Sequence, residues 1–321
     1  DGRPLRPLLA GLCGPALAPP AGHSSRYFEP IVSFPFTPGH EVVGDLDDGT
    51  RAVLIPVLSC VTRGIDPVCP ACAAGRTNHC GRLAFGHLEP GLQSGFCEST
   101  GGGWSAERGA PPSRPPGVPA PLPAEAAGMV EPTACAVHAA RRVAAHGPLD
   151  TVAVIGTGTL GLLTIAALRH ASSGATIGRI LATGKYPHQK DLARSLGADQ
   201  VVAPGELGRV VRSLTGAWVL GDGPEGPATG GEGQLTDGSL DPPPPCLPET
   251  ATRGSSANTR PAQEAAASVV ADADLGRLVS ATYPLSRYTE AIEHAATAGP
   301  RGAVKVAFDL RRTSSSTKDR R

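Results

Sequence analysis

The middle of the chain repeats a mostly apolar run followed by an amphipathic stretch. Residues 151–155 predict a buried strand, and residues 160–171 predict the helix that follows it. Further strands are predicted at 179–182 and 200–203, each followed by apolar residues at helical spacing. After the third strand these residues are Leu207, Val210, Val211 and Leu214. Alternation of strands and helices at this spacing predicts a parallel sheet.

The first 125 residues have a different pattern, with short β-type segments separated by turn-forming residues. The segments cover residues 31–34, 41–43 and 51–57 and predict an irregular all-β unit. Helical spacing then begins at Ala124, and Pro132 interrupts it, which predicts either a kink or a new helix start.

The regular pattern stops between residues 221 and 262, a segment that contains 8 Gly and 8 Pro. Its large apolar residues are Leu235, Leu240 and Leu247. Central parallel strands need continuous apolar runs because both of their faces are buried. We therefore predict that this segment is disordered or loosely draped over the rest of the chain. Order is predicted to return with a helix over 264–278 and a strand over 303–308.

A glycine motif links the first predicted strand of the parallel sheet to its helix. In a dinucleotide site of this type, the first glycine permits the tight turn and the second lets the backbone approach a pyrophosphate. The third lets the helix pack on the strand, and the helix N-terminus then binds the phosphates. A glycine-rich turn without a ligand is the alternative. The motif residues are Gly156, Thr157, Gly158, Thr159, Leu160 and Gly161.

The end of the second predicted strand bears on the choice of coenzyme. Sites specific for NAD usually place an acidic residue here for the ribose 2′-hydroxyl. This sequence has Gly184 and Lys185 instead, with His188 and Lys190 close behind. No carboxylate stands there to repel a 2′-phosphate, and Lys185 could attract one, so the sequence favours NADP over NAD. A solvated lysine with no ligand is the alternative interpretation.

Cys69, Cys72 and Cys80 have the C-x2-C-x7-C spacing of zinc ligands. Thiolates suit a closed tetrahedral site that holds a loop together and does no chemistry. The fourth ligand could be Cys60, nine residues before Cys69, or Asp66, three residues before it. We favour Cys60 because a fourth thiolate gives the commoner structural zinc site. Reduced cysteines without a metal are the alternative.

Charge and composition exclude several classes of protein. The 29 basic and 29 acidic residues balance, so no overall field attracts nucleic acid or an anionic membrane. No apolar run approaches the ~18 residues of a membrane-spanning helix. The 8 cysteines in 321 residues do not resemble a secreted disulfide scaffold, and Gly14 and Pro15 break the signal-like start of the chain. We expect a cytoplasmic protein with no nucleic-acid or membrane partner.

Several separated motifs together resemble the zinc-dependent medium-chain dehydrogenases, the superfamily of alcohol, polyol and glucose dehydrogenases. The resemblance covers roughly residues 5–220 and 272–310. Besides the glycine motif and the cysteine cluster, the matching residues are Leu12-Cys13-Gly14, Pro38-Gly39-His40-Glu41-Val42-Val43-Gly44, Gly101-Gly102-Gly103-Trp104, Glu131-Pro132-Thr133-Ala134-Cys135-Ala136-Val137-His138, Tyr283-Pro284-Leu285 and Lys305-Val306.

The resemblance implies an α/β fold with two domains. A GroES-like, β-rich zinc catalytic domain covers residues 1–136, and a Rossmann-type coenzyme domain with a doubly wound parallel sheet covers 137–280. The chain returns to the catalytic domain over 281–311 and ends in a tail at 312–321. Because of the segment 221–262, the second half of the coenzyme sheet is predicted to be degraded.

The resemblance also implies two zinc ions, one catalytic and one structural, and hydride transfer between NAD(P) and the hydroxyl of an alcohol, polyol or sugar. Cys13 and His40 match ligands of the catalytic zinc. Glu131 matches the third ligand of polyol- and glucose-type members, held directly or through water, and Glu41 matches the carboxylate beside the metal. A homodimer or homotetramer rests on the resemblance alone. Two further residues of the matching motifs, which we interpret as packing residues, are Cys135 and His138.

Two departures from the family pattern bear on activity. Pro15 and Ala16 stand where the family has a Ser or Thr and then an Asp, and proline has neither a hydroxyl nor an N–H to help carry the alcohol proton to solvent. The segment 221–262 stands where the family has the remaining coenzyme strands, as after a compensated frameshift and deletion or in a wrong gene model. We therefore expect an impaired dehydrogenase, with a catalytically inactive zinc-binding remnant as the alternative.

Overall fold

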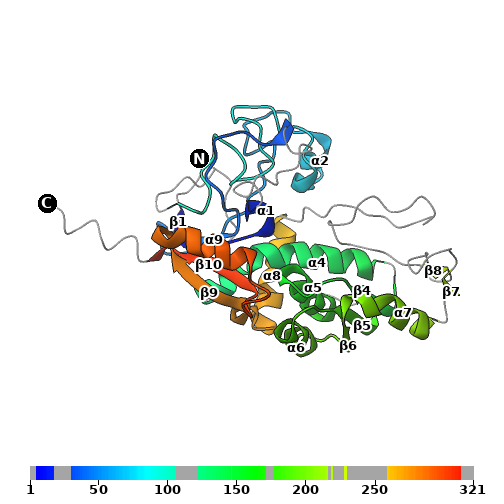
Figure 1. The fold of residues 1–321 in the computed structure, drawn as a ribbon. Helices are drawn as coiled ribbons and strands as arrows, with labels where there is room; N and C mark the ends of the chain where they lie inside the picture. The colour runs from blue at the N-terminus through cyan, green and yellow to red at the C-terminus, as the bar shows by residue number, and fades with distance from the viewer. Residues whose placement is uncertain are drawn as a thin grey trace. The chain divides into compact units, whose positions relative to one another are not determined.

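The computed structural model of the chain describes residues 5–17, 30–105, 122–145, 147–170, 177–215, 218–219, 228–229 and 259–311. Figure 1 shows the course of the chain. It divides into two compact units. The first comprises Asp1–Cys135 together with Ser256–Arg321, and the second comprises Ala136–Ser255.

A five-stranded sheet forms the centre of the first unit, in the order β3-β2-β1-β10-β9. Strand β1 is antiparallel to both β2 and β10, whereas β9 and β10 are parallel. A strand from near the start of the chain therefore pairs with one from near its end. The strands are β1 (Leu5–Gly11), β2 (Val42–Leu46), β3 (Arg51–Val53), β9 (Val279–Pro284) and β10 (Lys305–Asp309).

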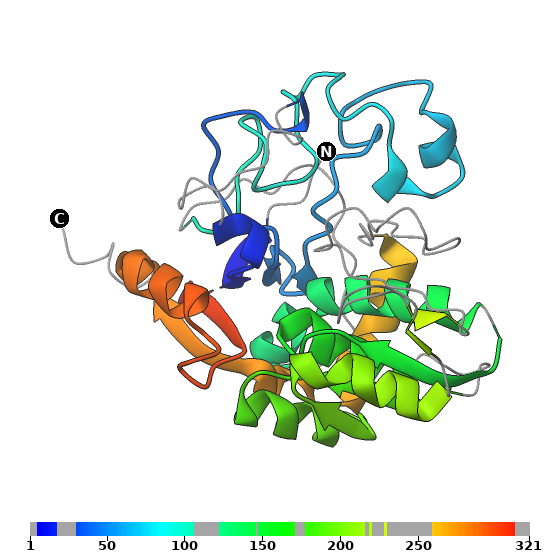
Figure 2. The ribbon, with the colours of Figure 1, turned by 45° about the vertical axis from the view of Figure 1, so that its right-hand side comes forward.

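The main apolar core of this unit lies between β1, β10 and helix α9 (Tyr288–Ala296). Helix α9 packs along β9 and β10 in both views of the fold (Figure 1 and Figure 2). Phe308 on β10 is fully buried there, and Trp104 meets it edge-on with 5.4 Å between the ring centroids. This core joins β10 and α9 to the segment that contains Trp104.

Prolines explain two differences between the predicted and observed strands of the first unit. Residues 31–34 are irregular instead of a strand, because Pro30 and Pro35 flank them and cannot donate to a sheet. Strand β1 was not predicted, because Pro7 interrupts its apolar pattern; the structure accommodates Pro7 at a shift of register against β2. The strand predicted at 51–57 is also shorter, ending at Val53.

Two helices follow Pro123. Helix α3 (Ala124–Gly128) ends before Met129, and helix α4 (Val130–Ala144) starts again at Val130. Pro132 therefore lies in the first turn of a new helix, where its missing N–H costs no intrahelical hydrogen bond. The sequence left open whether Pro132 marks a kink or a new helix start, and the structure shows a new helix start. Glu131 consequently lies in the first turn of α4.

The helix predicted over 264–278 is two elements in the structure. Helix α8 (Arg260–Asp272) begins four residues earlier, and a 3₁₀ turn, η4 (Leu275–Leu278), follows it. Asp274 has φ 49°, in the left-handed region, which ends the helix. The prediction of disorder to residue 262 was therefore wrong at its end, because Pro261 lies in the first turn of α8, where proline favours a helix start.

Residues 260–280 contact the first unit, although the sequence pattern places them in the coenzyme domain. Helix α8 and η4 both pack against α3. The Gln263 side chain donates a hydrogen bond to the Leu54 carbonyl over 3.2 Å. These contacts explain why the structure divides at Ser255 instead of at residue 280.

The second unit contains a sheet in the order β4-β5-β6. Neighbouring strands are parallel, as expected where strands alternate with helices. The predicted strands and helices of this part of the chain are all present. The elements are β4 (Leu149–Val154), α5 (Thr159–His170), β5 (Ile177–Thr183), α6 (Pro187–Ser195), β6 (Gln200–Val202), the 3₁₀ turn η3 (Pro204–Glu206) and α7 (Leu207–Thr215).

Beyond α7, a two-residue strand β7 (Trp218–Val219) pairs antiparallel with β8 (Ala228–Thr229). The rest of the segment predicted to be disordered, residues 221–227 and 230–258, lies outside the described residues, as does the tail from residue 312. Among the described helices, none combines the length and apolarity that crossing a membrane requires.

Candidate functional site

Three potential metal ligands meet at the ends of neighbouring strands in the first unit. Cys13 follows β1, and His40 and Glu41 directly precede β2. Because β1 and β2 are antiparallel, with Ala10 opposite Val42, the end of one strand lies beside the start of the other. The Cys13 sulfur, a His40 ring nitrogen and a Glu41 carboxylate oxygen all lie within 4.8 Å of one another.

Glycine makes room for this cluster. A Cβ at Gly11 would lie 2.1 Å from Glu41 Oε2, far inside van der Waals contact. Gly39 has φ 103°, a conformation that favours glycine, and a Cβ there would lie 2.4 Å from Trp104 Cδ1. The Trp104 indole in turn donates to the Gly11 carbonyl over 3.3 Å. Gly39 of the GHE motif and Trp104 of the GGGW motif therefore pack closely against each other, and Trp104 also contacts the end of β1 next to the cluster.

His40 is suited to bind a metal. Its side chain is buried, and its Nδ1 has no hydrogen-bond partner within the described part of the chain. Burial lowers the pKa of His40, which favours the neutral imidazole that binds metals. A buried nitrogen without a partner is costly in an empty site. The Phe96 ring lies beside the imidazole, with 5.7 Å between the ring centroids.

Lys305 and Glu41 form a buried ion pair at the same site. Burial alone would raise the pKa of Glu41, but the charges of Lys305 and His40 and the hydrogen bonds with Lys305 and Cys13 together outweigh burial, and the pKa is lowered. Burial alone would lower the pKa of Lys305, but the charges of Glu41, Cys13 and Glu131 and the hydrogen bond with Glu41 together outweigh burial, and the pKa is raised. Both groups are therefore charged. Burial and the nearby negative charge of Glu41 raise the pKa of the Cys13 thiol well above its usual value.

Glu131 is buried in the first turn of α4 but does not belong to the group within 4.8 Å. Its charge still acts on the cluster, since it raises the pKa values of both Cys13 and Lys305. Glu131, the predicted third ligand, thus acts on the cluster from outside it. The third member of the cluster is Glu41.

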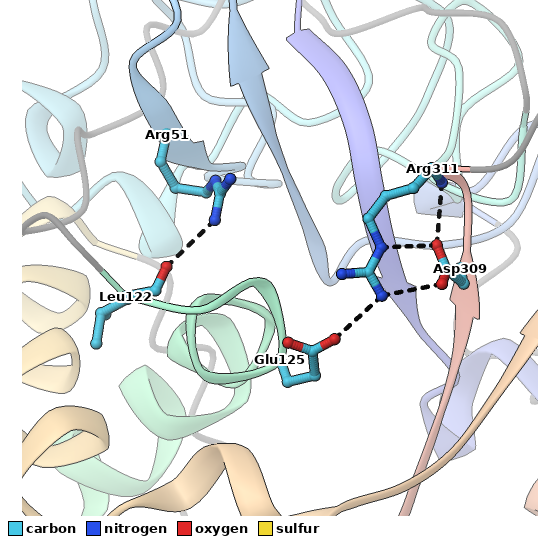
Figure 3. Close-up of polar contacts among 5 residues, drawn as sticks. All are labelled: Arg51, Leu122, Glu125, Asp309 and Arg311. Carbon is cyan, nitrogen blue, oxygen red and sulfur yellow. Dashed lines mark hydrogen bonds and ion pairs between the residues drawn. The ribbon is translucent and has the colours of Figure 1, made fainter. Parts of the chain in front are cut away.

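The polypeptide that leads to Glu131 is hydrogen-bonded to residues on or just after two strands of the sheet, β3 and β10 (Figure 3). Arg51 on β3 donates to the Leu122 carbonyl over 3.2 Å. Arg311, just after β10, donates to Glu125 in the first turn of α3 over 3.1 Å and also pairs with Asp309. These contacts fix the start of α3, and α4 with Glu131 follows it directly.

Four cysteines form a second cluster in what we call the cysteine lobe, residues 58–91. The sulfurs of Cys60, Cys69, Cys72 and Cys80 all lie within 4.8 Å of one another, around helix α2 (Pro70–Ala73; Figure 1). Cys60 and Cys80 are 3.6 Å apart between sulfurs, and the Cys69 backbone N–H donates to the Cys60 sulfur over 3.4 Å. Asp66 is not part of the group. The geometry therefore agrees with Cys60 as the fourth member.

The thiols of this cluster differ in acidity. Backbone hydrogen bonds from Cys72 and Gly81 lower the pKa of Cys69 to about 6. Burial raises the pKa of Cys72 to about 12. None of the described cysteines is in a disulfide, so all four sulfurs are available as ligands.

The glycine motif in the second unit forms the turn between β4 and α5. Gly156 has φ 90°, and its N–H donates to the Thr183 hydroxyl over 2.8 Å. A Cβ at Gly161 would lie 1.8 Å from the Gly156 carbonyl oxygen, so this glycine permits close packing of helix on strand. In contrast, Gly156 and Gly158 have nothing within 4 Å of a Cβ position, which leaves space over the turn.

The residues after β5 lie against the glycine turn. A Cβ at Gly184 would lie 2.8 Å from both the Thr157 hydroxyl and Lys190 Cγ. The Thr157 hydroxyl and His188 Nε2 are buried and have no hydrogen-bond partner among the described residues. The Lys185 ammonium lies 5.5 Å from the centroid of the Tyr186 ring. Strand β5 thus brings this basic segment beside the glycine motif.

Comparisons with known proteins agree with these motifs. L-Galactonate-5-dehydrogenase of Escherichia coli K12 is 31% identical over 167 residues, which is 47% of this chain and 41% of the relative. Sorbitol dehydrogenase of Bacillus subtilis 168 is 26% identical over 211 residues, 62% of this chain and 53% of the relative. The matches thus span about half the length of these relatives. No family model matches the chain.

Solved structures share the fold over nearly the whole chain. An alcohol dehydrogenase of Thermotoga maritima has a TM-score of 0.71 at 20% identity and covers 96% of this chain and 91% of its own. A protein of Sinorhizobium meliloti 1021, described as a zinc-binding dehydrogenase bound to NADP, has a TM-score of 0.69 at 23% identity and covers 96% and 93%. These comparisons support the resemblance of the chain to the zinc-dependent medium-chain dehydrogenases.

Sequence reasoning missed two features of the sites. Lys305 was matched only as part of a motif, and its pairing with Glu41 had no local signal because 264 residues separate the two. Arg63, which is fully buried inside the cysteine lobe, was not singled out at all, since nothing in its neighbours distinguishes it from a surface arginine. Pro15 lies in the short helix α1 (Gly14–Leu17), and its side chain is outside the described part of the chain.

Proposed function

We propose that this chain is a zinc- and NADP-dependent oxidoreductase that transfers hydride between NADP and the hydroxyl of an alcohol, polyol or sugar. The observation that carries the proposal is the convergence of Cys13, His40 and Glu41 within 4.8 Å, with a buried His40 nitrogen that has no partner among the described residues. The polyol and alcohol dehydrogenases among the relatives support this substrate class. A homodimer or homotetramer is the expected assembly.

The donor set of the first cluster fits zinc, which binds cysteine sulfur, histidine nitrogen and carboxylate oxygen. Cys13 and His40 would hold the ion, and Glu131 would complete the site directly or through water. A zinc ion with an open position lowers the pKa of a bound hydroxyl, as it lowers that of water from 15.7 to ~7. The cysteine lobe would hold a second, structural zinc through Cys60, Cys69, Cys72 and Cys80.

The chain's own residues tune the charge of the catalytic site. Lys305 keeps the Glu41 carboxylate ionised and holds it beside Cys13 and His40. Glu41 would then be available to approach the metal during ligand exchange. Because Glu41 and Glu131 both disfavour a further negative charge on Cys13, Lys305 offsets their repulsion and allows the thiolate that metal binding requires.

In the second unit, the glycine turn would bind the coenzyme's pyrophosphate at the N-terminus of α5. The open space above Gly156 and Gly158 allows that approach, and the unpartnered Thr157 hydroxyl can donate to a phosphate or ribose oxygen. Lys185 would attract the 2′-phosphate of NADP. The coenzyme's nicotinamide ring supplies the hydride acceptor.

We expect Lys185→Ala to weaken NADPH binding at least about tenfold and to leave NADH binding nearly unchanged. A hydrogen bond to a charged group contributes ~1.5–3 kcal/mol, and the 2′-phosphate is present only in NADPH. Fluorescence titration with each coenzyme measures both affinities. Arg209→Ala, at an exposed arginine of the same unit that pairs with Glu206, is the matched control. Equal losses for NADPH and NADH would contradict this role of Lys185.

Pro15→Ser should raise kcat at least about tenfold, because positioned proton transfer typically contributes 10²–10⁴-fold. The serine hydroxyl restores the group that the superfamily pattern has after Cys13-Gly14. Pro15→Ala is the control, since it removes the proline without adding a hydroxyl. Steady-state rates of NADP reduction give kcat for both variants. An equal gain in kcat for Pro15→Ala and Pro15→Ser would exclude a proton relay.

The proposal is tested by incubating zinc-loaded protein and NADP with a panel of primary alcohols, polyols and aldoses while following NADPH absorbance. We expect turnover of at least one class and loss of turnover after zinc chelation. Loss of activity that zinc does not restore would contradict a zinc enzyme. The alternative, an inactive zinc-binding remnant, is favoured by Pro15 and by the lack of apolar strand candidates at 221–262. Bound zinc without any turnover, also in the Pro15→Ser variant, would establish it.

A further inference from the structure

Arg63 lies at the centre of the cysteine lobe, between Cys60 and Cys69 in the sequence. It is the largest side chain among the fully buried residues of the described chain, with an exposed fraction of 0%. Its backbone also takes part in the lobe, because its N–H donates to the Cys60 carbonyl over 3.1 Å and its own carbonyl accepts from His87 N–H over 3.2 Å. The residue thus links the cysteine cluster to the loop over 85–91.

Within the described part of the chain, the acceptors of the Arg63 guanidinium are all backbone carbonyls. Its Nε bonds to Leu58, and its two terminal nitrogens bond to four carbonyls of the loop 85–91. The acceptors and distances are Leu58 at 3.1 Å, Phe85 at 3.1 Å, Leu88 at 3.0 Å, Glu89 at 3.2 Å from each terminal nitrogen, and Gly91 at 2.7 Å. One buried side chain therefore holds most of this loop in place.

No carboxylate forms an ion pair with Arg63 within the described ranges of the chain. A charge buried without a counter-charge is strongly destabilising, by several kcal/mol even after relaxation. The groups that act on Arg63 electrostatically are the sulfurs of Cys97, Cys80 and Cys60. The Cys97 thiol donates to the Glu89 carbonyl over 3.3 Å. Thiolates at Cys60 and Cys80 would supply the negative charge that Arg63 lacks.

Four thiolates around one divalent ion carry a net charge of minus two. We propose that Arg63 is a positioning residue, the counter-cation of a metal centre formed by Cys60, Cys69, Cys72 and Cys80, which couples metal binding to the order of the loop 85–91. This inference rests on the proposed function, specifically on a divalent metal in the cysteine lobe. It explains both the burial of the arginine and the absence of a carboxylate partner among the described residues.

Two substitutions separate the charge of Arg63 from its hydrogen bonds. Arg63→Lys keeps the positive charge but loses most of the carbonyl contacts, and Arg63→Met removes both at similar volume. In a Cys13→Ser background, which leaves the cysteine lobe as the remaining proposed metal site, zinc affinity is measured by competition with a chromophoric chelator. We expect Arg63→Met to weaken zinc affinity about 10–100-fold, as is typical when a residue that interacts with metal ligands is replaced. The zinc affinity of Arg63→Lys should stay within about threefold of that of the parent protein.

Arg82→Met is the matched control in the same lobe. Arg82 is a partly buried residue whose side chain donates to the Pro67 carbonyl, at 3.0 Å, and we expect Arg82→Met to leave zinc affinity unchanged. Equal losses for lysine and methionine would overturn the inference, because hydrogen bonding alone would then explain them. Unchanged affinity in Arg63→Met would overturn it as well. A parent protein with no zinc in the lobe would overturn both this inference and the proposed structural zinc.

A second measurement needs no substitution at Arg63. Amide hydrogen exchange of His87, Glu89 and Gly91 is compared in zinc-loaded and chelated wild-type protein. Their N–H groups are bonded to Arg63, Ser99 and Leu83, respectively. We expect exchange to become at least about tenfold faster without zinc, because the loop loses its electrostatic anchor. The Leu46 amide in the β2–β3 turn is the reference. Unchanged exchange in the loop would overturn the coupling.

Discussion

Cys13→Ser should reduce bound zinc from two ions per chain to one and lower kcat/KM by at least about 1,000-fold. The serine hydroxyl is a much harder and weaker ligand than a thiolate at neutral pH. Loss of the metal removes several kcal/mol of transition-state stabilisation, and each 1.36 kcal/mol is worth about tenfold in rate. Elemental analysis of the purified variant gives the zinc content, and NADP reduction gives the rate.

The control for this prediction is Cys135→Ser, a half-exposed cysteine that we interpret as a packing residue. It should retain both zinc ions and the parent rate. Two zinc ions in Cys13→Ser would show that Cys13 is not a ligand, and the proposed catalytic site would then need a different set of residues. Loss of both ions would instead indicate that the substitution disrupts the first unit as a whole.

Lys305→Met should lower the free energy of unfolding by about 3–5 kcal/mol, the usual cost of removing one partner of a buried ion pair. The side chains of Lys305 and Glu41 are only 4% and 2% exposed, so water cannot replace the lost charge. Urea denaturation of the chelated protein measures the effect without a contribution from metal binding. The double variant Lys305→Met with Glu41→Gln should recover part of the loss, since no buried charge is left unpaired.

The exposed pair of Arg194 and Asp191 provides the comparison for this experiment. Exposed ion pairs contribute ~0–1 kcal/mol, so Arg194→Met should have little effect. A small effect of Lys305→Met, similar to that of Arg194→Met, would contradict a buried, charged pair. Failure of the double variant to recover any stability would contradict the charge argument and indicate lost packing instead.

The Glu41–Lys305 pair also predicts how stability depends on pH. The pKa of Glu41 in the folded protein is lowered, so its contribution is fully present above the pKa of an unfolded glutamate and is lost as the pH falls through the folded pKa. The pKa of Lys305 is raised, so its contribution persists to alkaline pH. Chelated wild-type protein should therefore lose more stability on acidification than the double variant does.

Local sequence patterns were enough to predict the parts of the fold that depend on neighbouring residues. The parallel strands β4, β5 and β6 and the turn at Gly156 follow from apolar runs and from glycine spacing, which act over a few residues. The cysteine cluster was predictable for the same reason, since Cys69 and Cys72 are separated by one turn of α2. The choice of Cys60 over Asp66 needed only ligand chemistry.

The remaining features depend on residues far apart in the sequence. Pairing of β1 with β10 joins the two ends of the chain, and Pro7 conceals β1 from a pattern search. The partner of Glu41 lies 264 residues away, so no spacing could reveal it. Arg63 is a polar residue that is buried, and the backbone carbonyls that accept its hydrogen bonds lie up to 28 residues away in the sequence. The end of the coenzyme domain was misplaced because contacts between α8 and α3 are equally invisible in the sequence.

The central claim is that this chain binds a dinucleotide on the glycine turn of the second unit and a zinc ion at the Cys13 cluster of the first unit. The measurement that tests it most directly is a fluorescence titration of the purified, zinc-loaded protein with NADPH and, in parallel, with NADH. We predict saturable binding of both coenzymes, tighter for NADPH because of Lys185. Tighter binding of NADH would contradict the coenzyme assignment. No binding of either, by folded protein that retains zinc, would contradict the dehydrogenase function and leave a metal-binding remnant.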